Sequence, residues 1–293
     1  MSKRNICDEK FLHRINMFYR AFFPVTIFMR WMGALHCSEN RDITFKTLEG
    51  YWNRYSSLSS EKEIYHELLS SNILTIHVGA VYVDKPGREG VALGKELVFD
   101  IDITDYDSIR TCCKGRDHCN DCWQILEVTR NIIDRKLRDN FGFTNLMWVF
   151  SGGRGIHCWV LDKRTFKYDE EVRASICSVL SEKVISPEVT EGFTRIQCLN
   201  IESPLELGPR LDINVTTSIT HLTKSPFCVH PDTGYVCVPI NPDIPFLPSM
   251  APTIDSVEKS NGDVLIEYLG VFRSHIEDLC LQHSPPSPYN FDT

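Results

Sequence analysis

Two aspartates, Asp100 and Asp102, are the residues of this sequence whose type and spacing most clearly suggest chemistry. They stand in the segment ELVFDIDITDYD (96–107), where apolar residues at positions 97, 99, 101 and 103 alternate with a set that includes both carboxylates. Side chains alternate between the two faces of a strand, so Asp100 and Asp102 should share one face. Two neighbouring carboxylates repel each other, and the repulsion grows as water is removed. Bound cations would relieve it.

A divalent metal site is therefore one interpretation of this pair, and two solvated aspartates at a strand end are the other. Mg²⁺ prefers carboxylate oxygens and tends to bring substrate phosphates with it. Two such ions about 4 Å apart can activate an attacking oxygen and stabilise a leaving one. A site of this kind usually needs a third carboxylate from elsewhere in the chain. Asp212, in the strand-like run PRLDINV, is the candidate.

The segment SGGRGIH (151–157) is a candidate phosphate-binding turn. Its glycines at 152, 153 and 155 allow the backbone to approach a ligand and to turn several N–H groups toward an anion. Arg154 and His157 add cationic or hydrogen-bond-donating side chains. The spacing matches neither a Walker loop nor a dinucleotide-binding turn. A tight hairpin with an incidental arginine is the alternative, but the nearby aspartates favour phosphate binding.

Two further polar residues, Lys224 and His230, follow the Asp212 segment in HLTKSPFCVHPDTG. Alone, a lysine is usually solvated and a histidine is often a packed core residue. Their position directly after a candidate metal ligand makes both of them candidates for contact with phosphate.

Four cysteines fall within the eleven residues CCKGRDHCNDC, at Cys112, Cys113, Cys119 and Cys122. This spacing, with its terminal Cys-x-x-Cys, is typical of a structural zinc site made of four thiolates. His118 could replace one cysteine, and unrelated buried thiols are the alternative. A closed site of this type has no open position for catalysis. Because it follows the aspartate strand directly, we expect the zinc to fix the loop beside the active site.

The elements that must position these residues mix helical and strand patterns. Helical spacing and capping signals predict helices in 9–23, with Asp8 as N-cap, and in 26–35, 59–71, 121–141, 168–184 and 264–282. Strand patterns fall in 73–84, 96–104, 146–150, 156–162, 209–217 and in runs around the PDTG turn at 231–234. Because strands and helices do not alternate strictly, the expected class is α+β, or mixed α/β.

Composition limits the class of protein. The 293 residues are 42% hydrophobic and 24% charged, as in an ordinary globular protein with one large domain or two smaller ones. No run approaches the roughly 18 apolar residues of a membrane span. The N-terminus lacks the pattern of a signal peptide. We therefore expect no membrane association and a cytosolic or nuclear protein, in which the 12 cysteines are mostly reduced.

The net charge of −8 bears on nucleic-acid binding. Dedicated duplex binders are usually basic, because phosphate contacts supply most of their affinity. This chain would need a local basic surface, or help from a partner, to hold nucleic acid. No row of aromatic residues interleaved with basic ones stands out as a platform for single strands.

Taken together, these segments resemble the catalytic small subunit of the archaeal and eukaryotic DNA primase family, and most closely the eukaryotic type. The matching phrases, in order, are GAVY, ELVFDIDITDYD, the CC…C..C cluster, NIIDR, DNFGF, WVFSGGRGIHCWV, PRLDINV and HLTKSPFCVHP. They cover most of the chain from about residue 10 to 240. The resemblance implies a mixed α/β catalytic core with an inserted zinc knuckle. It also implies template-directed synthesis of short RNA primers from nucleoside triphosphates on single-stranded DNA.

The resemblance also assigns roles and partners. It implies that Asp100, Asp102 and Asp212 hold two Mg²⁺ or Mn²⁺ ions, and that the four cysteines hold one structural zinc. The implied nucleotide contacts are Ser151, Arg154, His157, Arg210, Lys224, His230 and, by a looser alignment, Arg54 in YWNRYSS. The implied partners are a large subunit with an iron–sulfur cluster and the DNA polymerase alpha complex, in the nucleus.

Three departures from the family pattern stand out. Gly153 replaces a usual arginine, and His77 replaces a usual aspartate, which puts a ribose contact there in doubt. The third is length, because a large helical insertion of the eukaryotic subunits shrinks here to about residues 163–205. We therefore expect one catalytic core over 1–282, with its zinc module at about 110–123, a much reduced helical subdomain and a flexible tail at 283–293.

Two other functions stay open. A primase-polymerase or repair polymerase of the same superfamily would use the same metal chemistry on deoxynucleotides. A non-catalytic scaffold could keep the zinc module only to bind a large subunit, although the presence of all three aspartates argues against such a loss of activity.

Overall fold

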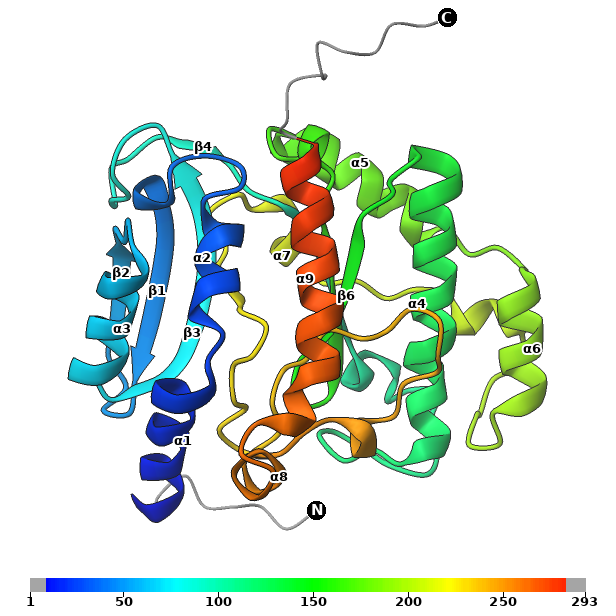
Figure 1. Cartoon of the computed structure of the whole chain (residues 1–293). Helices are drawn as coiled ribbons and strands as arrows, with labels where there is room; N and C mark the ends of the chain where they lie inside the picture. Colours follow the sequence, from blue (N-terminus) through cyan, green and yellow to red (C-terminus); the bar gives the residue numbers. More distant parts are fainter. Residues whose placement is uncertain (1–8, 283–293) are drawn as a thin grey trace, which may run out of the picture.

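Two antiparallel sheets form the framework of the protein (Figure 1). The computed structural model describes residues 9–282. The first sheet has the order β2-β1-β3-β4, with β8 also paired to β3, and the second has the order β5-β7-β6. The expected α+β, mixed α/β class is confirmed.

The strands of the first sheet are β1 (Arg41–Thr47), β2 (Trp52–Ser56), β3 (Ile73–Tyr82), β4 (Ala92–Gly94) and β8 (Thr223–Lys224). Those of the second are β5 (Leu97–Asp102), β6 (Leu146–Phe150) and β7 (Gly155–Val160). The sequence predicts β3, β5, β6 and β7 but not β1, β2, β4 or β8. Of the missed strands, β2, β4 and β8 are short or lie at an edge, whereas β1 is an inner strand of seven residues in which polar side chains dilute the apolar alternation.

Three N-terminal helices cover one face of the first sheet: α1 (Glu9–Phe22), α2 (Val25–Met32) and α3 (Glu61–Ser70) (Figure 1). Each was predicted from its spacing. The apolar face of α1 buries Phe11, Ile15, Phe18 and Tyr19. At α3, the Ser60 side chain accepts a hydrogen bond from the Glu63 N–H, as expected for a serine N-cap. The predicted cap of α1, Asp8, lies outside the described residues.

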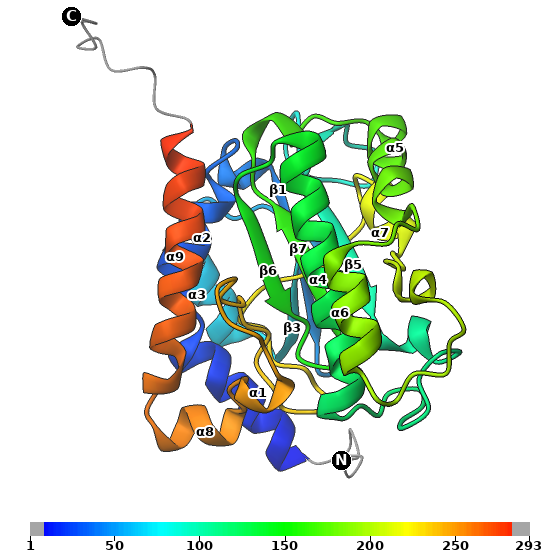
Figure 2. The same ribbon diagram turned by 90° about the vertical axis from the view of Figure 1, so that its right-hand side faces the viewer.

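The long helix α4 (Asn120–Phe141) packs on one face of the second sheet (Figure 2). Trp123 of α4 contacts Phe150 of β6 at 5.7 Å between ring centroids, and the Trp148 indole donates to Asp134 at 2.9 Å. The remaining helices are α5 (Glu170–Ser181), α6 (Pro187–Arg195), α7 (Ile213–Thr217), α8 (Ile254–Lys259) and α9 (Ile266–Leu281). Residues 163–205 thus contain only α5, α6 and short turns.

A buried set of aromatic and ionic contacts joins the part of the protein that contains the first sheet to the part that contains the second. Trp31 of α2 packs edge-on against Trp159 of β7, at 5.1 Å, and against Phe272 of α9, at 5.8 Å. Its indole donates to Glu96, which also pairs with the fully buried Arg41 at 2.5 Å. Removing one partner of such a buried ion pair typically lowers the free energy of unfolding by about 3–5 kcal/mol. This contact therefore fixes how the first sheet sits against the second.

None of the helices within residues 9–282 is long and apolar enough to span a membrane. Every cysteine in this part of the chain is free, in line with the expected reduced thiols. The predicted flexible tail, 283–293, lies outside the described residues.

Candidate active site

The two aspartates of β5 lie side by side on one face, as their spacing predicts. Across the ladder, Asp100 is opposite His157 and Asp102 is opposite Gly155, both on β7. The His157 Nε2 atom lies 3.6 Å from Asp100 Oδ1. The neighbouring residues on the other face, Phe99 and Ile101, are fully buried. The strand therefore holds both carboxylates at the partly open face of the sheet.

The predicted strand around Asp212 is wrong. Asp212 is instead the N-cap of the short helix α7, and its side chain accepts a hydrogen bond from the Asn214 N–H at 3.0 Å. Val, Ile and Thr residues suggest a strand, but an aspartate that can bond the backbone two residues ahead favours a helix start. The Asp212 N–H donates to the Asp100 carbonyl at 3.1 Å, so the third carboxylate still reaches the site.

Electrostatic repulsion is strongest at Asp100. Burial, then the charges of Asp102 and Asp212, raise its pKa to about 7. A fourth carboxylate, Asp105, has its pKa raised by partial burial and by the same cluster. Sequence reasoning missed Asp105, although it follows Asp102 by three residues. A cation bound between these carboxylates would lower their mutual repulsion.

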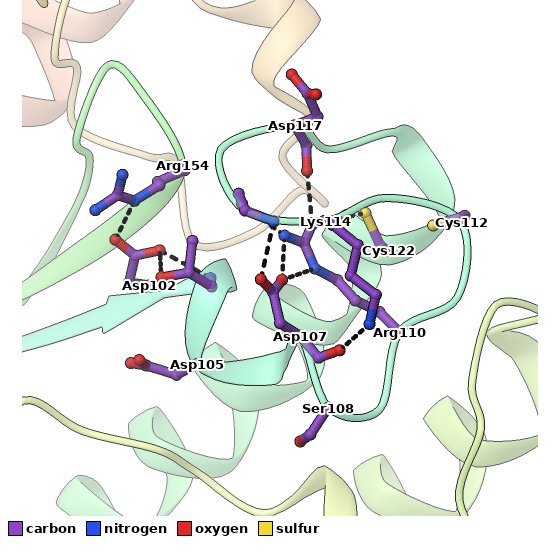
Figure 3. Close-up of polar contacts among 12 residues, drawn as sticks. Asp102, Asp105, Asp107, Ser108, Arg110, Cys112, Lys114, Asp117, Cys122 and Arg154 are labelled. Atoms are coloured by element: carbon purple, nitrogen blue, oxygen red, sulfur yellow. Dashed lines mark hydrogen bonds and ion pairs between the residues drawn. The ribbon is translucent and has the colours of Figure 1, made fainter.

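A cation already reaches Asp102 in the metal-free protein. The Arg154 Nε atom lies 2.5 Å from one carboxylate oxygen (Figure 3). The other oxygen accepts from the Thr104 N–H and hydroxyl, each at 2.8 Å. Within residues 9–282, the one group of possible metal ligands that all approach within 4.8 Å of one another is the cysteine cluster, not the aspartates. Closing the three carboxylates around metal would thus require Asp102 to exchange its bond to Arg154.

In the glycine loop between β6 and β7, the backbone carbonyls are hydrogen-bonded to the protein, whereas consecutive backbone N–H groups are not bonded within residues 9–282. Its carbonyls are bonded to the protein, because Gly152 accepts from Thr233, Gly153 faces the His118 ring nitrogen and Arg154 accepts from Ile103. Among the described residues, no group accepts from the N–H of residues 152, 153 or 154. The positive φ of Gly152, +80°, makes this turn possible. Unpaired consecutive N–H groups are what an anion-binding turn requires.

His230 packs directly against this loop. A side chain at Gly153 would place its Cβ 2.9 Å from His230 Nε2. An arginine, which the family usually has there, would require the imidazole to move. In this chain, His230 thus occupies space beside Gly153, and a second arginine is absent from the loop.

The three histidines of the site are neutral near pH 7. The pKa values of His157, His230 and His77 are all lowered to about 3, first by burial and next by the positive charge of Lys224. The sequence predicts that His157 is a cationic or hydrogen-bond-donating group. Its lowered pKa favours the role of a neutral hydrogen-bond donor. Its Nδ1 is buried and has no partner among the described residues. The positive charge near the loop therefore comes from Arg154 and Lys224.

Lys224 stands on β8, opposite His77 of β3, and its ammonium donates to the Ser151 carbonyl at 3.3 Å. A second lysine, missed from sequence, fixes this segment. The buried Lys95 ammonium donates to the His221 carbonyl and to the Thr223 hydroxyl. Burial lowers the pKa of Lys95 to about 7.

Two predicted nucleotide contacts are bonded elsewhere. Arg210 donates to the Asp105 carbonyl and to Ser108, and it stacks over the Tyr106 ring at 4.9 Å. Arg54 of β2 pairs with the buried Asp42 at 2.7 Å. Neither guanidinium is bonded to the glycine loop in this structure.

The four predicted cysteines come together as a candidate zinc site. Their sulfur atoms all lie within 4.8 Å of one another, with Cys119 Sγ at 3.3 Å from Cys112 Sγ and 3.8 Å from Cys122 Sγ. Four thiolates at about 2.3 Å from a tetrahedral zinc ion lie roughly 3.8 Å apart. The donor set therefore fits zinc. His118, the predicted substitute ligand, instead bonds the glycine loop.

A buried arginine organises the zinc-binding loop (Figure 3). Arg110 donates to the Asp107 carboxylate, to the carbonyls of Asp117 and Gly115, and to Cys122 Sγ at 3.7 Å. Two more contacts tie the loop to the site, namely His118 to the Gly153 carbonyl at 3.1 Å and Arg116 to Asp232 at 2.8 Å. The expectation that the zinc module fixes the loop beside the aspartates thus has a direct structural basis.

Comparison with known proteins agrees with this geometry. A family model described as DNA primase small subunit matches residues 99–242, which hold β5, the cysteine cluster, the glycine loop and Lys224. The DNA primase small subunit of Drosophila melanogaster is 29% identical over 345 aligned residues, which cover 81% of this chain and 79% of that protein. The chain is therefore similar to DNA primase small subunits over most of its length.

Other relatives extend the comparison. The DNA primase small subunit of Saccharomyces cerevisiae is 26% identical and covers 89% of this chain and 90% of its own. The polymerase domain of Mycobacterium tuberculosis ligase D, solved in complex with DNA, superposes with a TM-score of 0.44 at 15% identity, over 82% of this chain and 89% of that chain. The Drosophila alignment of 345 residues exceeds the 293 residues present here, so that primase carries residues with no counterpart in this chain.

The raised pKa of Asp100 predicts a pH-dependent gain in stability for Asp100→Asn without added divalent metal. The unfolded carboxyl has a pKa of about 3.9, whereas the folded one titrates at about 7. The ionised group therefore costs stability increasingly as pH rises from 4 to about 7. In thermal melts, the melting temperature of Asp100→Asn should lie above that of the wild type at pH 8 and should equal it near pH 4. Asp243→Asn, on an exposed loop, is the control. A gain that is the same at both pH values would contradict this assignment.

The cysteine cluster predicts a zinc-dependent loss of stability for Cys122→Ser. In small zinc domains, a closed structural site contributes roughly 10–16 kcal/mol of zinc-binding free energy. Loss of one thiolate ligand should remove several kcal/mol of this free energy. We expect a lower melting temperature and less zinc per chain by elemental analysis. Cys37→Ser, at an exposed free cysteine, should change neither quantity. Fresh wild-type protein without zinc would refute the site.

Proposed function

We propose that this chain is the catalytic subunit of a DNA primase, which joins nucleoside triphosphates into short RNA primers on single-stranded DNA. The observation that carries this proposal is the juxtaposition of the unpaired N–H groups at 152–154 with Arg154 and the aspartate face. Similarity to DNA primase small subunits over most of the chain supports it. The reaction is a nucleotidyl transfer that needs positioning and charge neutralisation rather than a protein nucleophile.

Asp100, Asp102 and Asp212 would hold two Mg²⁺ or Mn²⁺ ions. Burial and the charges of Asp102 and Asp212 raise the pKa of Asp100, and a bound cation would relieve this repulsion. When bound, the metals would supply charge neutralisation for an in-line phosphoryl transfer. The residues of this chain prepare for that state, because Thr104 holds one oxygen of Asp102 while Arg154 holds the other.

The glycine loop and Lys224 would hold the triphosphate. Unpaired N–H groups at 152–154 donate to phosphate oxygens, and Lys224 adds a charge at the Ser151 end of the loop. Arg154 would have two roles, since it pairs with Asp102 in this structure and would be available to a phosphate if a metal ion took its place on that carboxylate. His157 and His230, neutral before binding, serve as hydrogen-bond donors.

A polymerase that accepts deoxynucleotides is the second candidate, and His77 favours it. This neutral imidazole stands opposite Lys224, where the family usually has a carboxylate that could accept a bond from a sugar hydroxyl. Its Nε2 is already within 2.9 Å of the Thr75 hydroxyl. Competition between the two nucleotide types on one template separates the candidates.

Partners complete the proposal. The relatives are named as small subunits, which supports a complex with a large subunit. We extend this to an iron–sulfur large subunit and the DNA polymerase alpha complex, acting in the nucleus.

The direct test is metal-dependent primer synthesis on single-stranded DNA by Asp102→Asn. Loss of a metal-ligating carboxylate should lower the rate at least about a hundredfold, while Asp243→Asn, on an exposed loop, should keep wild-type activity. Metal-dependent synthesis that survives in Asp102→Asn would exclude the two-metal assignment. No synthesis by wild type, even with a large subunit, would favour the scaffold function.

A second test concerns initiation. The site described above accounts for one triphosphate, whereas joining the first two nucleotides requires two to be held together. We therefore expect the isolated chain to extend an annealed primer far better than it forms a dinucleotide, and a large subunit to narrow the difference. Both products are measured at matched salt. Efficient initiation by the chain alone, unchanged by the partner, would reveal a second nucleotide site.

A further inference from the structure

One face of the first sheet carries a polar row that leads from its outer edge to the candidate active site. Residues opposite each other on neighbouring strands project to the same side. The ladder places Trp52 of β2 opposite Lys46 of β1, and Lys46 opposite Thr75 of β3. Two residues further along β3, His77 is opposite Lys224 of β8. We call these five residues the open sheet face.

The other face of the same strands is apolar and covered. Ile43 and Phe45 of β1 and Ile76 and Val78 of β3 are fully buried, on the side where α1, α2 and α3 lie (Figure 1). The sheet thus has one face packed into the core and one face given to polar and aromatic groups.

Trp52 is unusual among the tryptophans of this chain. It is 47% exposed, whereas the other four, all within the described residues, are at most 1% exposed. Its ring packs against two side chains of the same face. The His77 and Trp52 ring centroids are 5.0 Å apart, and the Lys46 ammonium lies 5.2 Å from the indole centroid. Tyr51, the preceding residue at the tip of the β1–β2 hairpin, is 70% exposed. A large apolar ring fixed in place and left open to solvent suggests a binding surface.

The charge of this face suits a polyanion. Lys46 and Lys224 lie on it, and Arg54 neutralises the buried Asp42 beneath it. The nearest exposed carboxylate in sequence, Glu49, accepts a hydrogen bond from Asn72. Glu49 stays ionised, because this bond lowers its pKa, but within residues 9–282 neither Lys46 nor Lys224 forms an ion pair, so both can contact a phosphate.

The open sheet face is continuous with the candidate active site. Lys224 is its last member and also donates to Ser151, at the start of the glycine loop. From β2 to β8 the sheet spans three strand spacings, roughly 14 Å. A strand of nucleic acid that crosses this face from Trp52 would therefore arrive at the glycine loop and the aspartates.

We propose that Trp52, supported by Lys46 and His77, is a stacking site for an unpaired base of single-stranded nucleic acid that enters the active site across the open sheet face. Indole rings stack on any base, and a nearby cation binds the phosphate that follows. The direction of entry rests on the proposed function, whereas the stacking contact itself does not.

The test is the binding of a mixed-sequence single-stranded DNA oligonucleotide to the full chain, without nucleotide or added divalent metal. Because Trp52 is the one exposed tryptophan, stacking should quench the intrinsic fluorescence of the wild type. Trp52→Ala should weaken binding about tenfold, and Trp52→Phe should retain most of it. Tyr65→Ala, an aromatic residue of α3 that is 41% exposed, is the matched control and should bind as the wild type does.

An oligonucleotide of the same length with abasic sites separates base stacking from phosphate contact. Wild type and Trp52→Ala should bind the abasic strand with equal, weak affinity. Absence of quenching, equal affinity of wild type and Trp52→Ala for the normal strand, or an equal loss on the abasic strand would overturn the proposal. So would a raised KM for nucleotide with unchanged oligonucleotide affinity, which would place Trp52 against the nucleotide instead.

This experiment stays readable if the proposed function fails. Trp52→Ala should weaken oligonucleotide binding by the same factor in the wild-type and in the Asp102→Asn background, because Trp52 and Asp102 lie on different sheets. A wild type that binds DNA through Trp52 but makes no primer would leave stacking intact and exclude catalysis. Active primer synthesis, together with equal DNA affinity of the wild type and Trp52→Ala, would exclude the stacking site and leave the proposed catalysis intact.

Discussion

Repulsion among the carboxylates at the end of β5 is the constraint around which the rest of the site is arranged. Asp100 and Asp102 share a strand face, and the Asp212 N–H bonds to Asp100 itself, so three like charges meet at one place. In the metal-free protein only part of this charge is compensated. Asp102 receives Arg154 and Thr104, whereas within residues 9–282 Asp100 forms no ion pair with a lysine or arginine, and burial and its neighbours raise its pKa to about 7. Such a cluster costs stability unless a ligand completes it, which is the usual sign of a functional site rather than a structural one.

The zinc module explains how the opposing loop keeps its shape. Two hydrogen bonds between Ser151 and Gly155 close the base of the turn, and its carbonyls are held from outside. His118 of the module, Thr233 of the PDTG turn and Ile103 after β5 each hold one carbonyl. Arg110 then fixes the module through several bonds of its own. A closed zinc site with no catalytic role suits this task, because its value lies in holding one short loop at a fixed distance from the aspartates.

Local signals predicted the parts of the site that depend on local geometry. The alternation in β5 placed Asp100 and Asp102 on one face, and the cysteine spacing predicted a cluster that the structure brings together. Asp212 was placed on a strand because its β-branched neighbours outweighed a single capping side chain. The open sheet face was missed for another reason. Trp52, His77 and Lys224 meet only through the pairing of β1 with β2 and of β3 with β8, and no local pattern carries that register. Lys95, which holds β8 in place, was missed on the same ground.

The balance of charge in the site argues that metal and nucleotide bind together. Four carboxylates, Asp105 included, lie near Arg154 and Lys224, and Arg154 is already paired with Asp102. The histidines add no charge, because burial and Lys224 keep them neutral. A triphosphate arriving alone would therefore meet a site of net negative charge, and metal arriving alone would have to displace Arg154 from Asp102. A cation bound by the aspartates would compete with Arg154 for Asp102, and Arg154 released from Asp102 would be available to a phosphate, so each ligand would favour binding of the other.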